Sequence, residues 1–193
     1  MLRAVILALS LAILTGCWGA ETQLFGSGDW AQPDGLEGRF VSEDAAGETQ
    51  GSVVLLRRPD GLIDGTVTRK SEDKPRTSAM GFVAIPGGSG RYYLMVNRTA
   101  ERKGGEFYLI GRWKDERLEA FWPQCAGTPE MAGIKRDKIE LVNEAVCTFA
   151  SKQAVLTAAL LAERELETKR MFEPQLLGRL KRPDKSPSPE PTN

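Results

Sequence analysis

Short apolar segments alternate with turn residues along most of this chain, and that rhythm limits what it can fold into. Pro59-Asp60-Gly61 and Pro86-Gly87-Gly88 are typical turn sequences, because proline presets φ and glycine accepts positive φ. Evenly spaced short strands of this kind predict a mainly β (α+β) domain over residues 37–150, either an antiparallel meander or a small up-and-down barrel of about eight strands. The expected strands are residues 36–41, 52–57, 62–69, 78–85, 91–98, 106–114, 117–122 and 138–142.

Side chains alternate within these segments as they do in strands. In residues 91–98 one face carries Tyr92, Leu94 and Val96, and the other carries Tyr93, Met95 and Asn97. In residues 106–114, Phe107, Leu109 and Trp113 lie opposite Glu106, Tyr108, Ile110 and Arg112. The face of residues 106–114 that carries Tyr108 and Ile110 is more apolar than water alone would favour, so we expect another element to cover part of it.

The expected cover is a helical segment over residues 151–181. Ser151 is a suitable N-cap, and Val155, Ala159, Ala162 and Leu166 form an apolar stripe at helical spacing. Glu163, Arg164, Glu165 and Glu167 are expected to face away from that stripe. Pro174 ends the main helix, and residues 175–181 add one or two turns. Residues 182–193 are rich in proline and predict a disordered tail.

The first 17 residues have the three zones of a secretory signal. Arg3 is followed by an apolar run over residues 4–14, which as a helix would be about 16 Å long, too short to span roughly 30 Å of hydrocarbon. The run ends in Leu14-Thr15-Gly16-Cys17, which resembles the lipobox of bacterial lipoproteins.

This resemblance implies that residues 1–16 are a lipoprotein signal peptide and that Cys17 carries the fatty acyl (palmitate-type) anchor. Residues 17–36, rich in polar residues and glycine, are then expected to be the lipidated tether. By the sorting habit of the class, Trp18 after Cys17 indicates the outer membrane, facing the periplasm. The expected membrane contact is therefore made through the N-terminal lipid.

Cys125 and Cys147 remain once Cys17 is set aside. An even number of cysteines in an oxidising compartment predicts one disulfide, since reactive pairs are usually much closer together in sequence. The alternative is a pair of reactive thiols.

Composition excludes several classes of function. Lys plus Arg and Asp plus Glu are both 26, so the chain lacks the positive excess of a nucleic-acid binder. Histidine is absent, which excludes catalytic triads and zinc sites that use histidine. No acidic loop has the ligand density of a metal site, and we expect no metal and no cofactor.

Carboxylates on strands are the remaining catalytic candidates. Glu106, Glu119 and Glu140 all lie in predicted strands, and two of them converging in one cleft could perform acid/base chemistry. Strand glutamates that alternate with apolar residues are more commonly on the solvated face, so the chain is expected not to be an enzyme.

Aromatic residues gather in three consecutive predicted strands. Core packing explains such a cluster, and a ligand pocket or partner surface is the functional alternative. The candidates for that surface are Tyr92, Phe107, Tyr108, Trp113 and Trp122.

Leu36-Glu37-Gly38-Arg39-Phe40 resembles the Leu-x-Gly-x-aromatic opening of lipocalin-type barrels. Phe40 stands where the family has tryptophan, and neither the Thr-Asp-Tyr turn nor a clearly placed closing arginine is evident. The sequence thus predicts an envelope lipoprotein with a non-enzymatic binding or scaffolding role toward a protein or glycan partner. The alternative that the resemblance implies is a lipocalin-like carrier of a small lipophilic ligand.

Overall fold

A computed structural model describes residues 18–69, 72, 74–98, 105–123, 125, 139–143, 146–168 and 175–183. The predicted signal peptide, Cys17 and residues 184–193 of the predicted tail lie outside the described residues. The cleavage, the lipid anchor and the disorder of the tail therefore stay predictions.

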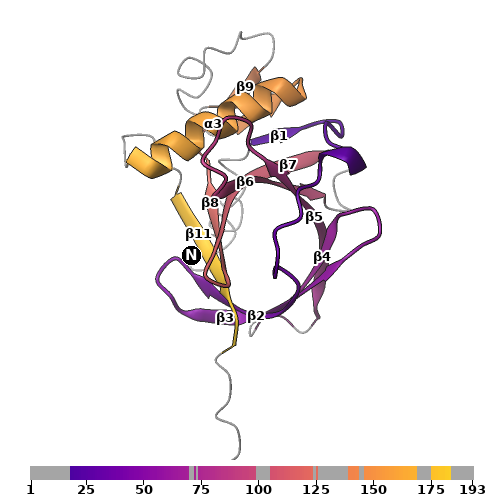
Figure 1. Ribbon diagram of the computed structural model, residues 1–193, viewed down its shortest axis with the longest axis vertical. Coiled ribbons are helices and arrows are strands. Elements are labelled where there is room, and N and C mark those ends of the chain that lie inside the picture. Colours follow the sequence, from indigo (N-terminus) through magenta and orange to yellow (C-terminus); the bar gives the residue numbers. More distant parts are fainter. Residues whose placement is uncertain are drawn as a thin grey trace, which may run out of the picture.

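Eight strands form a closed antiparallel barrel, which Figure 1 shows as a ring. Seven of them follow one another as an up-and-down meander, pairing neighbour to neighbour from β2 to β8. The eighth, β11, lies between β8 and β2 and closes the barrel. The strands are β2 (Gly38–Asp44), β3 (Thr49–Arg57), β4 (Ile63–Arg69), β5 (Arg76–Ala84), β6 (Tyr92–Arg98), β7 (Glu106–Lys114), β8 (Arg117–Trp122) and β11 (Gln175–Lys181). The predicted fold class is confirmed.

The closing strand corrects the prediction of helical turns over residues 175–181. β11 pairs along both edges, because closure of the barrel leaves β2 and β8 each with an edge that needs hydrogen-bond partners. Leu180 packs against the inner core, whereas Arg179 and Lys181 form ion pairs with Glu119 and Glu43.

Three further strands extend the sheet beyond the barrel: β1 (Trp18–Ala20), β10 (Val146–Phe149) and β9 (Ile139–Asn143). β1 pairs antiparallel with β7 and parallel with β10. The segment predicted at 138–142 is thus a strand, but as β9 it pairs with β10 outside the barrel.

β1 also corrects the prediction of a tether over residues 17–36. On one edge of β7, the pairing with β8 begins only at Ile110. The first residues of β7 on that edge are therefore free to pair with β1. Trp18 is only 1% exposed, and Phe25 and Leu36 are also buried. The segment therefore belongs to the folded domain.

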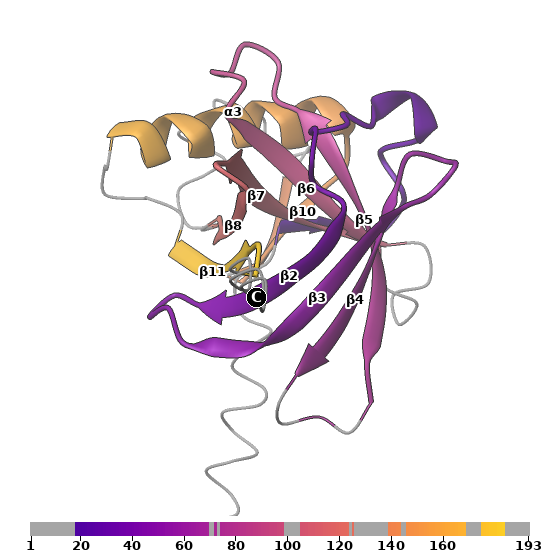
Figure 2. The same ribbon diagram turned by 60° about the horizontal axis from the view of Figure 1, so that its bottom comes forward.

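Two cores lie on opposite faces of the barrel wall, as the alternation predicted. Met95 and Leu109 belong to the inner core, whereas Leu94 and Ile110 belong to the outer one. Helix α3 (Lys152–Thr168) covers the outer core and contacts β6, β7 and β10. Figure 2 shows α3 lying across one side of the barrel, away from the wall that β2, β3 and β4 form.

The helix begins as predicted, because the Ser151 hydroxyl accepts a hydrogen bond from the Ala154 N–H at 3.3 Å. The predicted stripe from Val155 to Leu166 is buried. Glu163 and Glu165, expected to face away, are buried too. Glu163 lies against the β5–β6 turn and accepts the Ser89 N–H, so a turn distant in sequence covers this carboxylate.

Candidate functional site

One end of the barrel is closed by side chains. Phe40 and Trp113 pack edge to face, and the Trp113 indole donates to the Asp34 carbonyl at 2.8 Å. The Arg182 guanidinium lies 4.4 Å from the centre of the Phe40 ring and donates to the Gly35 carbonyl at 2.6 Å. Arg182 therefore covers this end of the barrel, a contact that the sequence did not reveal because the residue lies just after an unrecognised strand.

The middle of the barrel is filled by two methionines. A Cβ built on Gly65 would lie 2.8 Å from the Met80 Cε, and one on Gly111 would lie 2.6 Å from the Met95 sulfur. Both distances are too short for a side chain, so each glycine makes room for the neighbouring methionine. The two methionine side chains therefore occupy the space inside the barrel beside these glycines.

Five residues lie on the inner face toward the other end of the barrel, and we call this group the barrel mouth: Val67, Ser78, Asn97, Phe107 and Trp122. Asn97 pairs in register with Met80 on β5 and Phe107 on β7, so the three side chains share the inner face. Val67, Ser78, Phe107 and Trp122 are half-buried.

Asn97 is the chemically distinctive residue of the mouth. Its side chain is only 6% exposed, and its Nδ2 has no hydrogen-bond partner among the described residues. A buried amide donor without a partner costs about 1–3 kcal/mol, and a ligand acceptor would remove that cost. The mouth therefore combines half-buried aromatic surface with one unused donor.

The five aromatic residues predicted as one surface are divided between the two faces of the wall. Tyr92 and Tyr108 are buried in the outer core beneath α3. Phe107, Trp113 and Trp122 pack against the inner core, Trp113 at the closed end. Only Phe107 and Trp122 belong to the mouth.

Glu106 corrects the prediction of a solvated glutamate, since it is 0% exposed. Its carboxylate accepts hydrogen bonds from Arg98, the Tyr108 hydroxyl and the Leu24 N–H. Burial raises the pKa of Tyr108, and the neighbouring Glu106 charge raises it further. This network joins the N-terminal segment to β6 and β7 and is a structural feature.

Glu119 lies in a different place, on the outer wall near the β7–β8 turn. It accepts hydrogen bonds from Arg112 at 2.7 Å and from Arg179 at 3.2 Å. Burial alone would lower the pKa of Arg112, but the hydrogen bond and charge of Glu119 outweigh it and raise that pKa. The structure therefore does not bring Glu106 and Glu119 together; the side chain of Glu140 lies outside the described residues.

An open polar hollow of about 450 Å³ adjoins Glu119, and we call it the outer hollow. It is lined by Arg112, Lys114, Asp115, Arg117 and Glu119. Its charged lining suits a polar or anionic partner and not a lipophilic one.

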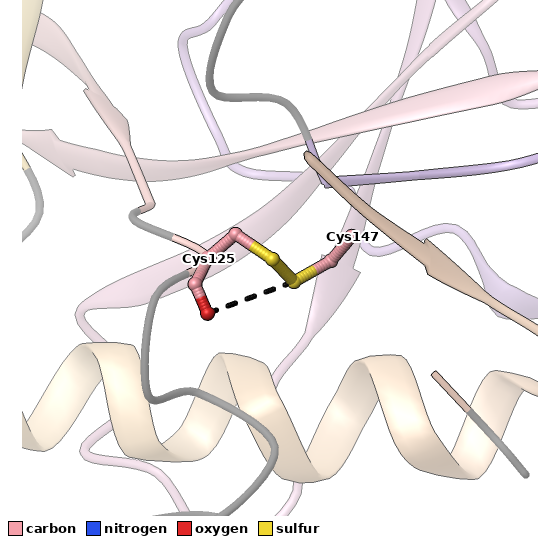
Figure 3. Close-up of a disulfide and its surroundings, with 2 residues drawn as sticks. All are labelled: Cys125 and Cys147. Carbon is pink, nitrogen blue, oxygen red and sulfur yellow. Dashed lines mark hydrogen bonds between the residues drawn. A yellow bond between two sulfur atoms is a disulfide. The ribbon is translucent and has the colours of Figure 1, made fainter. Parts of the chain in front are cut away.

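Cys125 and Cys147 form a disulfide, with their Cα atoms 5.6 Å apart, which agrees with the prediction. Figure 3 shows the bridge beside α3, and both cysteines belong to the outer core beneath that helix. The bridge ties the segment that follows β8 to the strand β10, which adjoins β1.

Within the described ranges, no cluster of three or more acidic or cysteine side chains could hold a metal ion. The same part of the chain contains no helix that is both long and apolar enough to cross a bilayer. Comparison with known proteins finds no matching family model, no matching curated protein and no matching solved structure.

Proposed function

We propose that this chain is a lipid-anchored lipoprotein of the bacterial cell envelope with a non-enzymatic binding role. The lipobox-like sequence ending in Cys17 supports the anchor, and the expected place is the outer membrane, facing the periplasm. The Cys125–Cys147 disulfide agrees with an oxidising compartment.

The anchor is tested by replacing the cysteine. Cys17→Ala is expected to release the protein from membranes into the soluble fraction, because one unacylated chain has no comparable hydrophobic attachment. Mass spectrometry of the native protein should find acyl groups on an N-terminal Cys17. Unchanged membrane association of Cys17→Ala would contradict the proposal.

The barrel mouth carries the binding role, through the unpartnered Asn97 donor among half-buried apolar side chains. Such a site suits a small, largely apolar molecule with one hydrogen-bond acceptor. Met80 and Met95 occupy the space inside the barrel beside Gly65 and Gly111, which favours a ligand held at the mouth end. This supports a lipocalin-like carrier function.

A dansylated fatty acid is a suitable probe, because Trp122 in the mouth can transfer excitation to it. The wild type is expected to bind the probe saturably at one site. Asn97→Leu should weaken binding by about tenfold, the effect of losing one hydrogen bond to a buried donor.

Leu56→Ala is the matched control, since Leu56 is an apolar side chain 60% exposed on the outer wall. It should leave binding unchanged. Absence of saturable binding by the wild type, or equal losses in Asn97→Leu and Leu56→Ala, would exclude the mouth as the site.

The outer hollow favours a second candidate, scaffolding of an envelope protein or glycan. Arg112, Lys114 and Arg117 offer donors around one open depression. Crosslinking in native membranes should then recover a stoichiometric partner, and Arg117→Glu should abolish its capture. Capture that is equal in Arg117→Glu and wild type would rule out this surface.

A further inference from the structure

The folded domain begins at the residue that follows the predicted lipid attachment site. Trp18 is the first residue of β1, and one peptide bond, with about 3.8 Å between Cα atoms, separates it from Cys17. Trp18 pairs in register with Tyr108 on β7 and with Cys147 on β10. No spacer residue therefore lies between Cys17 and the sheet.

The chain after β1 is held to the barrel as well. The Leu24 N–H donates to the buried Glu106 carboxylate at 3.0 Å. Arg98 donates to the Phe25 carbonyl, and the Ala31 N–H donates to the Phe82 carbonyl at 2.6 Å. Hydrogen bonds thus hold the segment after β1 to the barrel at several points, and it cannot act as a flexible linker.

The Cys125–Cys147 disulfide lies next to β1, the strand that follows the proposed lipid attachment site. Cys147, the β10 partner of Trp18, is bonded to Cys125 in the outer core. β1 therefore lies between β7 of the barrel and a strand that a disulfide holds in place. Separating β1 from the domain would require breaking backbone pairing on both of its edges.

We infer that the domain rests directly on the bilayer surface, with the β1–β10 corner at the lipid interface. This rests on the proposed acylation of Cys17, whose glycerol group would lie at that interface. Thr148 pairs with Gly19, so its Cα lies within about 12 Å of the Cys17 Cα. A flexible spacer of about 20 residues would instead allow a separation of about 25 Å.

The test uses the full-length acylated protein in phosphatidylethanolamine–phosphatidylglycerol vesicles. A fluorophore is attached to the thiol of Thr148→Cys, because Cys17 would be acylated and the other two cysteines are bonded to each other. The quencher is a nitroxide on the lipid headgroup. The comparison protein carries the same label and an inserted Gly/Ser spacer of about 20 residues between Cys17 and Trp18.

Quenching at position 148 is expected to fall at least about twofold when the spacer is present, because the mean separation about doubles. Equal quenching in the two proteins would overturn the inference. Ala150→Cys, at an exposed position just beyond β10, provides a second label site, and melting curves verify that each variant is folded. Mass spectrometry separates the two ideas: an unacylated Cys17 refutes the proposed function and this inference together, whereas equal quenching with Cys17 acylated refutes this inference alone.

Discussion

Glu106→Gln is expected to lower the free energy of unfolding strongly, although the two side chains have almost the same shape. The carboxylate is fully buried and accepts four hydrogen bonds, so both of its oxygens face donors. Oε1 accepts from Arg98 Nε at 3.1 Å and Nη2 at 2.8 Å. Oε2 accepts from the Leu24 N–H and the Tyr108 hydroxyl, both at 3.0 Å.

A glutamine amide cannot replace this carboxylate, because one of its two ends is itself a donor. If the NH₂ group faces Arg98, donors oppose donors and the guanidinium loses its counter-charge. If it faces Leu24, the backbone N–H loses its acceptor, although the Tyr108 hydroxyl can rotate. Breaking a buried ion pair typically costs about 3–5 kcal/mol, and the low end applies because Arg98 is partly exposed.

A loss of about 3 kcal/mol corresponds to a fall in Tm of about 6–12 °C for a chain of this size. Urea unfolding followed by tryptophan fluorescence measures it. Glu37→Gln is the control, since Glu37 pairs with Arg57 while half-exposed and should lose less than about 1 kcal/mol. Equal losses in the two variants, or a loss below about 1 kcal/mol for Glu106→Gln, would refute the reasoning.

Two further predictions concern bonds that join distant segments. Cys147→Ser opens a 23-residue loop (147 − 125 + 1) and should cost roughly 3 kcal/mol; identical melting of the wild type with and without reductant would contradict this. The hydrogen bond from Lys152 lowers the pKa of Asp29 below 3.8, so their ion pair stabilises the fold above that pH and is lost as pH falls through the folded pKa. Asp29→Asn should therefore lose about 0.5 kcal/mol at neutral pH and match the wild type in strong acid, and a difference independent of pH would exclude the pairing.

Local patterns were sufficient to predict the features that depend on neighbours in sequence. Turn residues located the meander from β2 to β8. Proline restricts φ and glycine widens the allowed range of φ, and both effects are local to the residue. Alternation assigned Leu94 and Met95 to opposite cores, and the stripe from Val155 to Leu166 predicted the helix that covers one of them.

The candidate site was predictable only in part. Phe107 and Trp122 were among the aromatic candidates, and both lie at the barrel mouth. Asn97 was assigned to the correct face, but nothing in the sequence indicated that its amide would be buried without a partner. Arg182 at the closed end was missed because its role requires Phe40, which lies far away in the chain.

The sequence by itself determined a β-rich chain with one amphipathic helix and one cysteine pair, since periodicity and turn chemistry act over a few residues. Only the tertiary structure decided that residues 18–20 and 175–181 are strands and that Glu106 and Glu163 are buried. A short segment becomes a strand when a distant edge offers it hydrogen bonds, and a carboxylate can be buried when distant donors meet it. Neither the distant strand edge nor the distant donors can be identified from the sequence of the segment alone.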